Sequence, residues 1–139
     1  MTSHHTLLTK AIEALRARTF YAAYPEHPAP AIYGETADAD GQTKFKTALG
    51  KRFTELKQIG ESGWAGQEES PYLQQPLNIS YPTFTVETLI TKSKEAFHEW
   101  RKISKEDRAE ILIESLERVK KRFFEIAYAT MHTTGQGYM

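Results

Sequence analysis

The chain has 139 residues, and its 18 basic side chains balance 18 acidic ones, so that its formal net charge is zero. A neutral chain lacks the basic surface that nucleic-acid binding and attachment to anionic membranes require. The chain contains no cysteine, which excludes thiolate nucleophiles and Cys-ligated zinc or iron–sulfur clusters within these residues.

The sequence gives no sign of export or of membrane insertion. No apolar run approaches the roughly 20 residues that are needed to span a bilayer. The opening stretch, MTSHHTLLTK, has no uninterrupted apolar segment after a basic one, so it is not typical of a secretion signal. There is also no cysteine for a disulfide framework. We therefore expect a soluble, cytoplasmic protein.

The first predicted helix covers residues 6–22. Pro25 should end it, because the residue before a proline avoids the α conformation. The following stretch, YPEHPAPAIYG at 24–34, contains three prolines and is expected to be an extended connector. The helical spacing rests on apolar residues of one face, Leu8, Ile12, Leu15 and Ala22.

A second helix is predicted over residues 36–49, with Gly50 ending it. Gly41 weakens its helical preference by about 1 kcal/mol relative to alanine. Residues 50–84 are predicted to form a long irregular loop, of a length that is unusual in an isolated compact domain. Within that loop, LNISY at 77–81 could form one short edge strand.

The third helix is predicted from Thr85, as N-cap, to about Trp100. Apolar and small residues recur every three or four positions and predict one buried stripe. The stripe consists of Val86, Leu89, Ile90, Ser93, Ala96, Phe97 and Trp100.

The fourth predicted helix has the clearest pattern. Ser104 and Asp107 match a capping box, and Gly135 is placed to end the helix. Because only a few residues separate it from the third helix, we expect the two to form an antiparallel pair. Its apolar stripe runs through Leu112, Leu116, Val119, Phe123, Ile126 and Thr130.

None of the chemical motifs in the chain has the context that its chemistry needs. Glu95 and His98 form one E-x-x-H pair, but a di-iron bundle requires two such pairs and further glutamates. The five histidines are scattered and no G-x-S-x-G accompanies them, so we expect His132, at the end of a helix, to satisfy helix carbonyls. The turn TGQGYM lacks the preceding strand and the third glycine of a dinucleotide site.

Two further motifs have both a structural and a binding interpretation. The basic run RVKKRFF at 118–124 is expected to be a solvated face with i,i+4 ion pairs, and the alternative is an anion or partner site. PEHP at 25–28 is a P-x-x-P match in a connector, with a ligand role as the alternative. No catalytic, cofactor-binding or metal-binding residue is predicted in this chain.

The two last helices resemble the amino-terminal helical region of the aldehyde dehydrogenase superfamily. That region combines an alanine-containing helix with an aromatic residue and a tryptophan, a short turn, an Arg-Ala pair that opens the next helix, and a Thr-Gly-[Lys or Gln] end. The matching residues here are Ala96, Phe97, Trp100, Arg108–Ala109 and Thr134–Gly135–Gln136.

The upstream residues resemble the opening of PaaN, a family of dehydrogenases of phenylacetic acid degradation. This extension is absent from most of the superfamily. The similarity lies in YAAYPEHPAPAIYGE, ALGKRF, GWAGQEESPY and the YP at 81–82. The closing HTTGQGYM is similar to the point at which that family continues into its next segment.

The resemblance implies a mainly α chain of amphipathic helices with a long irregular loop, forming the N-terminal part of an aldehyde dehydrogenase-like α/β fold. Residues 1–84 would be a family-specific extension, and residues 85–139 a helical pair at the start of the dehydrogenase-like domain. The family oxidises an aldehyde with NAD or NADP, here a ring-opened CoA semialdehyde, through a cysteine nucleophile that this chain lacks.

We therefore expect an N-terminal fragment with a scaffold role, inactive alone. Its partners would be the remainder of the parent polypeptide and, in the full-length form, further copies of it. The residues by themselves leave one alternative open, a free-standing helical interaction module without enzyme activity.

Overall fold

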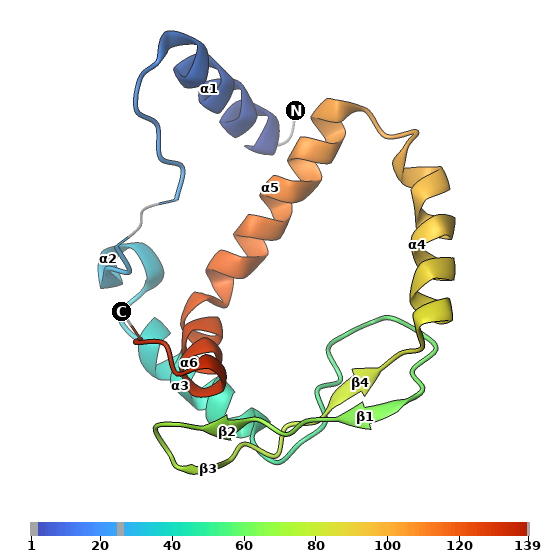
Figure 1. Ribbon diagram of the computed structural model, residues 1–139. Coiled ribbons are helices and arrows are strands. Elements are labelled where there is room, and N and C mark those ends of the chain that lie inside the picture. Colours follow the sequence, from blue (N-terminus) through green and yellow to red (C-terminus); the bar gives the residue numbers. More distant parts are fainter. Residues whose placement is uncertain (1–2, 25–26, 139) are drawn as a thin grey trace.

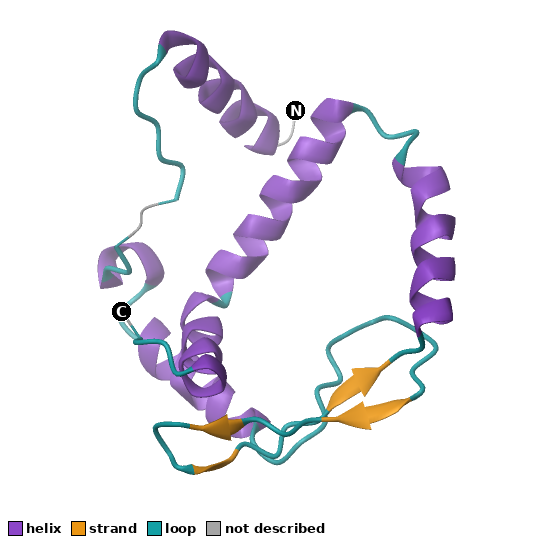
Figure 2. Cartoon of the chain, in the orientation of Figure 1, coloured by secondary structure: helices purple, strands orange, loops and turns teal. Residues whose placement is uncertain are grey.

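The computed structural model of the chain describes residues 3–24 and 27–138. Within these residues the chain is mainly helical, with six helices and two small antiparallel ribbons (Figures 1 and 2). The predicted fold class is thus confirmed. None of the described helices is both long and apolar enough to cross a membrane.

Helix α1 (Ser3–Ala17) ends well before the predicted boundary at residue 22. Arg18 adopts a left-handed φ of 55°. Its N–H donates to Leu15 O at 3.3 Å, and the next N–H, of Thr19, donates to Ala14 O at 3.0 Å. This is the hydrogen-bond pattern of a Schellman cap, which satisfies carbonyls at the helix end. Pro25 therefore does not set the end of α1.

The proline-rich connector, which the sequence predicts to be extended, is extended only in part. It contains a single-turn helix, α2 (Pro30–Tyr33), which has proline at its first position, where the missing N–H costs nothing. Helix α3 (Ala37–Ala48) follows where the sequence predicts it. Gly50 comes after its last turn with a left-handed φ of 72°.

The long loop contains two short ribbons. Strand β1 (Gly63–Ala65) pairs with β4 (Tyr81–Thr83), with Trp64 opposite Pro82. Strand β2 (Glu69–Ser70) pairs with β3 (Gln75–Pro76). The strand predicted at 77–81 is wrong in position. Leu77 and Ile79 instead belong to the core, 2% and 5% exposed, between the two ribbons.

Both caps predicted for the later helices are present. Thr85 accepts a hydrogen bond from Thr88 N at the start of α4 (Val86–Trp100). Ser104 accepts one from Asp107 N, 3.0 Å away, at the start of α5 (Lys105–Lys121). These local signals place both helix starts correctly.

The fourth predicted helix is two helices. α5 stops at Lys121, and α6 (Phe123–Thr134) begins after Arg122, whose φ of −115° and ψ of 15° interrupt the helix. Immediately after the break, the rings of Phe123 and Phe124 both contact Tyr33, with centroids 5.1 and 5.6 Å away. The apolar spacing continues through the break, so periodicity gives no sign of it.

The best-packed part of the molecule lies where α3 crosses α6. Phe45 of α3 is 4% exposed and forms the core with Leu77 and Ile79. Gly41 is buried at the crossing, where a Cβ would lie 2.5 Å from Phe124 Cβ. Aromatic and small residues pack around this core, namely Ala48, Leu49, Phe53, Tyr81, Tyr128 and Ala129.

The predicted pairing of the third and fourth helices is not a packed pair. α4 and α5 run in opposite directions from their connecting turn but diverge from each other (Figure 1). α5 packs instead against α1, where His4 Nε2 lies 2.8 Å from Glu114 Oε2 and His5 Nδ1 lies 3.2 Å from Glu110 Oε1. The stripe that was predicted to be buried on α4 is exposed in the structure, and the neighbour predicted for it, α5, is also wrong.

Candidate interaction surface

A buried polar pair joins the β2–β3 ribbon to α6. Ser70 and His132 are 1% and 7% exposed, and Ser70 Oγ lies 2.7 Å from His132 Nδ1 in a hydrogen bond. Phe45 stacks on the imidazole, with centroids 4.7 Å apart and planes 4° from parallel. Burial lowers the pKa of His132, which favours the neutral ring. His132 thus has a structural role, but its partner is a serine hydroxyl rather than the helix carbonyls that we had predicted.

The end of α6 is fixed by a left-handed glycine and a tyrosine. Gly135 has a φ of 75°, as its predicted role in ending the helix requires. The Tyr72 hydroxyl donates to Gly135 O at 3.1 Å and to Gln136 O at 3.0 Å. The G-x-G of this turn is therefore part of a helix end.

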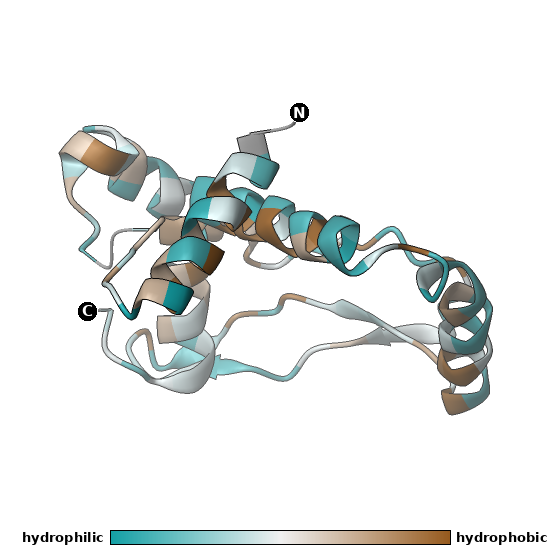
Figure 3. Ribbon diagram, turned by 90° about the horizontal axis from the view of Figure 1, so that it is seen from above, coloured by the Kyte–Doolittle hydropathy of each residue, from teal (hydrophilic) through white to brown (hydrophobic). Residues whose placement is uncertain are grey.

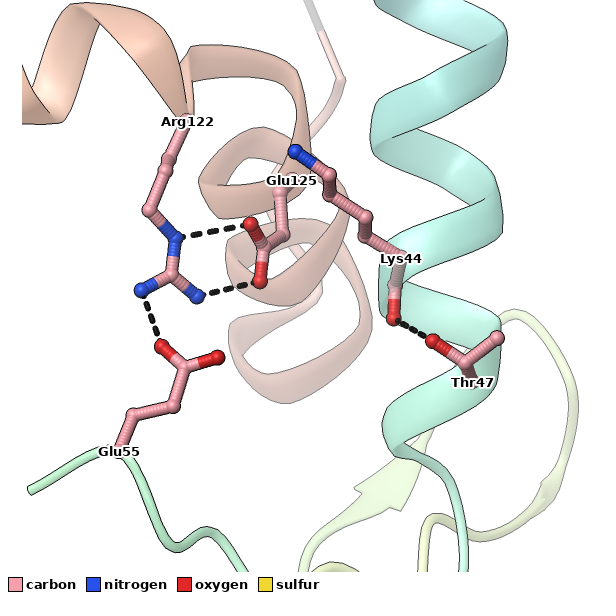
Figure 4. A network of polar contacts seen from close by, with 5 residues as sticks. All are labelled: Lys44, Thr47, Glu55, Arg122 and Glu125. Carbon is pink, nitrogen blue, oxygen red and sulfur yellow. Dashed lines mark hydrogen bonds and ion pairs between the residues drawn. The ribbon is translucent and has the colours of Figure 1, made fainter.

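An ion-pair network surrounds the break between α5 and α6 (Figure 4). Arg122 Nε donates to Glu125 Oε2 at 2.8 Å, its Nη2 donates to Glu125 Oε1, and its Nη1 bonds Glu55 on the loop after α3. These hydrogen bonds raise the pKa of Arg122 and lower that of Glu125. The network attaches the loop at residue 55 to the first turn of α6.

An apolar groove of about 430 Å³ lies beside this network, between α3, the 79–81 segment and the α5–α6 junction. Arg118, Arg122 and Glu125 are its charged residues. Its apolar lining comes from Phe45, Ala48, Phe53, Ile79, Tyr81, Val119, Ile126 and Ala129. No titratable pair in this lining is arranged as a nucleophile and base.

The motifs that we weighed in the sequence do not gather into a site. Glu95 and His98 lie exposed on α4, and in the described part of the chain no three ligating side chains come together as a metal site would need. In the basic run, Arg118 Nε contacts Glu114 Oε1 at 2.9 Å, the ion pair expected of a solvated face. Half of PEHP lies outside the described residues.

The most unusual feature of the molecule is its exposed apolar surface. On α4, five large apolar side chains, which we call the α4 stripe, are between 37% and 65% exposed: Val86, Leu89, Ile90, Phe97 and Trp100. Along α5 and α6 a second set is between 42% and 60% exposed: Ile111, Leu112, Leu116, Val119 and Ile126. Figure 3 shows brown, hydrophobic stretches of ribbon along both α4 and α5.

The total surface confirms that the exposure is more than a local effect. The chain exposes 10597 Å². A compact monomer of 15.9 kDa exposes about 7,400 Å² by the usual scaling with mass. The excess of roughly 3,000 Å² is comparable to the area of an obligate protein–protein interface. The chain therefore exposes much more surface than a compact monomer of its mass.

Comparisons with known proteins show what this chain is similar to. No protein-family model matches the chain, and no curated protein sequence matches it. A solved structure does match: the crystal structure of an NAD-dependent aldehyde dehydrogenase from Burkholderia multivorans, with a TM-score of 0.85 and 37% sequence identity over 99% of this chain. The fold is that of part of an aldehyde dehydrogenase.

The aldehyde dehydrogenase match covers only a portion of that enzyme. This chain corresponds to 25% of the Burkholderia multivorans chain, so it spans about a quarter of that dehydrogenase's length. The similarity to the superfamily that the last two helices predict is thereby supported. The finer similarity to PaaN stays a prediction.

The sequence identified the apolar residues of the α4 and α5 stripes but not that they are exposed. The stripes of α4 and α5 were predicted from their three- and four-residue spacing, and the structure leaves both exposed. The Glu55–Arg122 ion pair and the Ser70–His132 pair were missed, because each joins residues more than 60 positions apart. No local signal in the sequence indicates such contacts.

Proposed function

We propose that this chain is the N-terminal scaffold of an NAD(P)-dependent aldehyde dehydrogenase. The observation that carries the proposal is the match to the Burkholderia multivorans NAD-dependent aldehyde dehydrogenase, at 37% identity over 99% of this chain. The excess exposed surface supports it, because a scaffold segment has its apolar faces covered by the rest of its enzyme.

In this proposal the chain contributes no reacting group. Aldehyde oxidation in the superfamily uses a cysteine thiolate that attacks the carbonyl, and hydride leaves to the nicotinamide. The chain has no cysteine. NAD or NADP and the catalytic residues belong to the remainder of the parent enzyme. What residues 1–139 supply is the support on which that catalytic part packs.

The finer proposal is a PaaN-like enzyme of phenylacetate catabolism, which oxidises a ring-opened CoA semialdehyde to the acid. Its support is the similarity of residues 21–35, 48–53 and 63–72 to the opening of that family. Residues 1–84 are then a family-specific extension and residues 85–139 the start of the dehydrogenase-like domain. We also propose a cytoplasmic, homo-oligomeric parent enzyme.

A chimaeric enzyme tests the scaffold role. Residues 1–139 replace the matching quarter of the full-length Burkholderia multivorans dehydrogenase, and reduction of NAD is followed at 340 nm with an aldehyde substrate. We expect the chimaera to fold and to oxidise the aldehyde, and the isolated 139-residue chain to show no turnover. Aldehyde turnover by the isolated chain, or a chimaera that does not assemble, would contradict the scaffold role.

Growth tests the choice of pathway independently. Deletion of the gene in its own host should abolish growth on phenylacetate as sole carbon source and leave growth on succinate unchanged. Normal growth of the deletion strain on phenylacetate would remove the PaaN-like substrate from the proposal and leave the scaffold role intact.

A further inference from the structure

Helix α4 lacks a packing partner within the described chain. None of its 15 residues is buried, and its two ends lead into the β1–β4 ribbon and into the turn before α5 (Figure 1). A helix of this length is marginal in water without tertiary packing. Something outside the described residues must therefore stabilise α4 in the assembled protein.

The apolar residues of α4 define a single binding face. Members of the α4 stripe recur at spacings of three, four and seven residues, which puts them on one side of the helix. On the opposite side, Lys92 Nζ contacts Glu95 Oε2 at 3.2 Å, and both side chains are more than half exposed. One face of α4 suits an apolar partner and the opposite face suits water. A single partner on one side of the helix can therefore cover its apolar residues.

The matched crystal structure indicates which partner covers the α4 stripe. The match extends over 99% of this chain with a TM-score of 0.85, so α4 takes a similar place in a chain four times as long. The open placement of α4 in this chain is thus part of an arrangement that matches a portion of a full-length dehydrogenase. The whole chain exposes roughly 3,000 Å² more than a compact monomer, an area within the range of obligate interfaces.

Resting on the proposed function, we infer that the α4 stripe is the docking surface for the catalytic portion of the dehydrogenase polypeptide. Phe97 and Trp100, in the last turn of α4, are its anchors, because large aromatic side chains contribute most to the binding energy of an interface. The guanidinium of Arg108 lies 6.0 Å from the ring centroid of Trp100, at the outer distance of a cation–π contact.

Two neighbouring substitutions in the chimaera test this surface. Ile90→Glu puts a carboxylate on the stripe, whereas Thr91→Glu puts the same group one residue further, away from the stripe. Both positions are exposed in this chain, so neither substitution disturbs its own core. We expect Ile90→Glu to lower the yield of assembled, active chimaera about tenfold or more, because the new charge must be buried. Thr91→Glu should leave the yield unchanged.

The outcomes separate the inference from the proposed function. An active unsubstituted chimaera with equal yields for Ile90→Glu and Thr91→Glu would overturn the docking surface and leave the scaffold role standing. An unsubstituted chimaera that never assembles would instead overturn the scaffold role, and with it the partner assigned to α4.

Hydrogen exchange in the isolated chain gives a second measurement that needs no chimaera. We expect the amides of α4 to exchange with little protection in the monomer, while those of α3 and α6 are protected. Strong protection of α4 in the monomer would show that no partner is needed. Protection that arises only with concentration-dependent dimer formation would assign the stripe to a second copy of the chain. Either result would overturn the inference.

Discussion

Gly41 shows how one missing side chain determines whether two helices can cross. A Cβ at this position would lie 2.5 Å from Phe124 Cβ and 2.8 Å from Glu125 N. Sequence reasoning treated this glycine only as a weakness of the second helix, whereas the structure gives it a packing role. The close approach of α3 and α6 depends on it.

Replacing Gly41 by alanine sets two effects against each other. The substitution gains about 1 kcal/mol of helix propensity but forces the helices apart, at a cost of about 1–3 kcal/mol. We expect Gly41→Ala to lower the free energy of unfolding in a urea titration. Lys46→Ala, at an exposed position of the same helix, is the control and should have little effect. A stabilised Gly41→Ala chain would contradict the close crossing.

His132 should make the stability of the chain depend on pH. Burial lowers its folded-state pKa, whereas in the unfolded chain the pKa is about 6.5. The unfolded state therefore binds the proton more readily, and the free energy of unfolding falls as pH decreases through about 6.5. We expect His132→Asn to reduce the slope of Tm against pH between about pH 7 and 5, and the exposed control His98→Gln to keep it. An unchanged slope in His132→Asn would be inconsistent with a buried neutral imidazole.

Individual elements differ in how much the sequence could reveal. Thr85 and Ser104 predict helix starts correctly because an N-cap is a contact between residues three positions apart. The end of α1 at Arg18 was missed because a left-handed arginine is an uncommon helix terminator. The break at Arg122 was missed because the apolar spacing continues through it.

The two ribbons and the absence of a neighbour for α4 among the described elements could not be predicted from the sequence for other reasons. Strands of two or three residues carry too little alternation to stand out in a loop, and β1 pairs with β4 across 15 or more intervening residues. An amphipathic stripe predicts that a helix face needs cover but does not name the neighbour. The stripe of α4 was therefore assigned to α5, although in the structure it faces no other described element closely.

The two capped helices should respond differently to loss of their caps in the isolated chain. Ser104→Ala removes the cap of α5, which packs on α1 and joins α6, and should lower the free energy of global unfolding by about 1 kcal/mol. Thr85→Ala should reduce only the helicity of α4, seen by circular dichroism, and leave the cooperative transition in place. Equal losses of global stability would indicate that α4 is part of the cooperative unit.

At the scale of the whole molecule, the exposed surface decides how the isolated chain behaves. The exposed apolar set along α5 and α6 favours self-association of the isolated chain. We expect the purified 139-residue chain to show concentration-dependent oligomers by light scattering, and Leu112→Glu, on the exposed face of α5, to reduce them. A chain that stays a monodisperse monomer at high concentration would favour a free-standing module.

The central claim is that these residues work as a covered part of an aldehyde dehydrogenase. The most direct test is to purify the native gene product from its own cells through a tag on residue 1, and to measure its mass and its NAD(P)-dependent aldehyde oxidation. The account predicts an assembly several times heavier than 15.9 kDa that oxidises an aldehyde. A stable product of 15.9 kDa, without a catalytic partner and without activity, would contradict it.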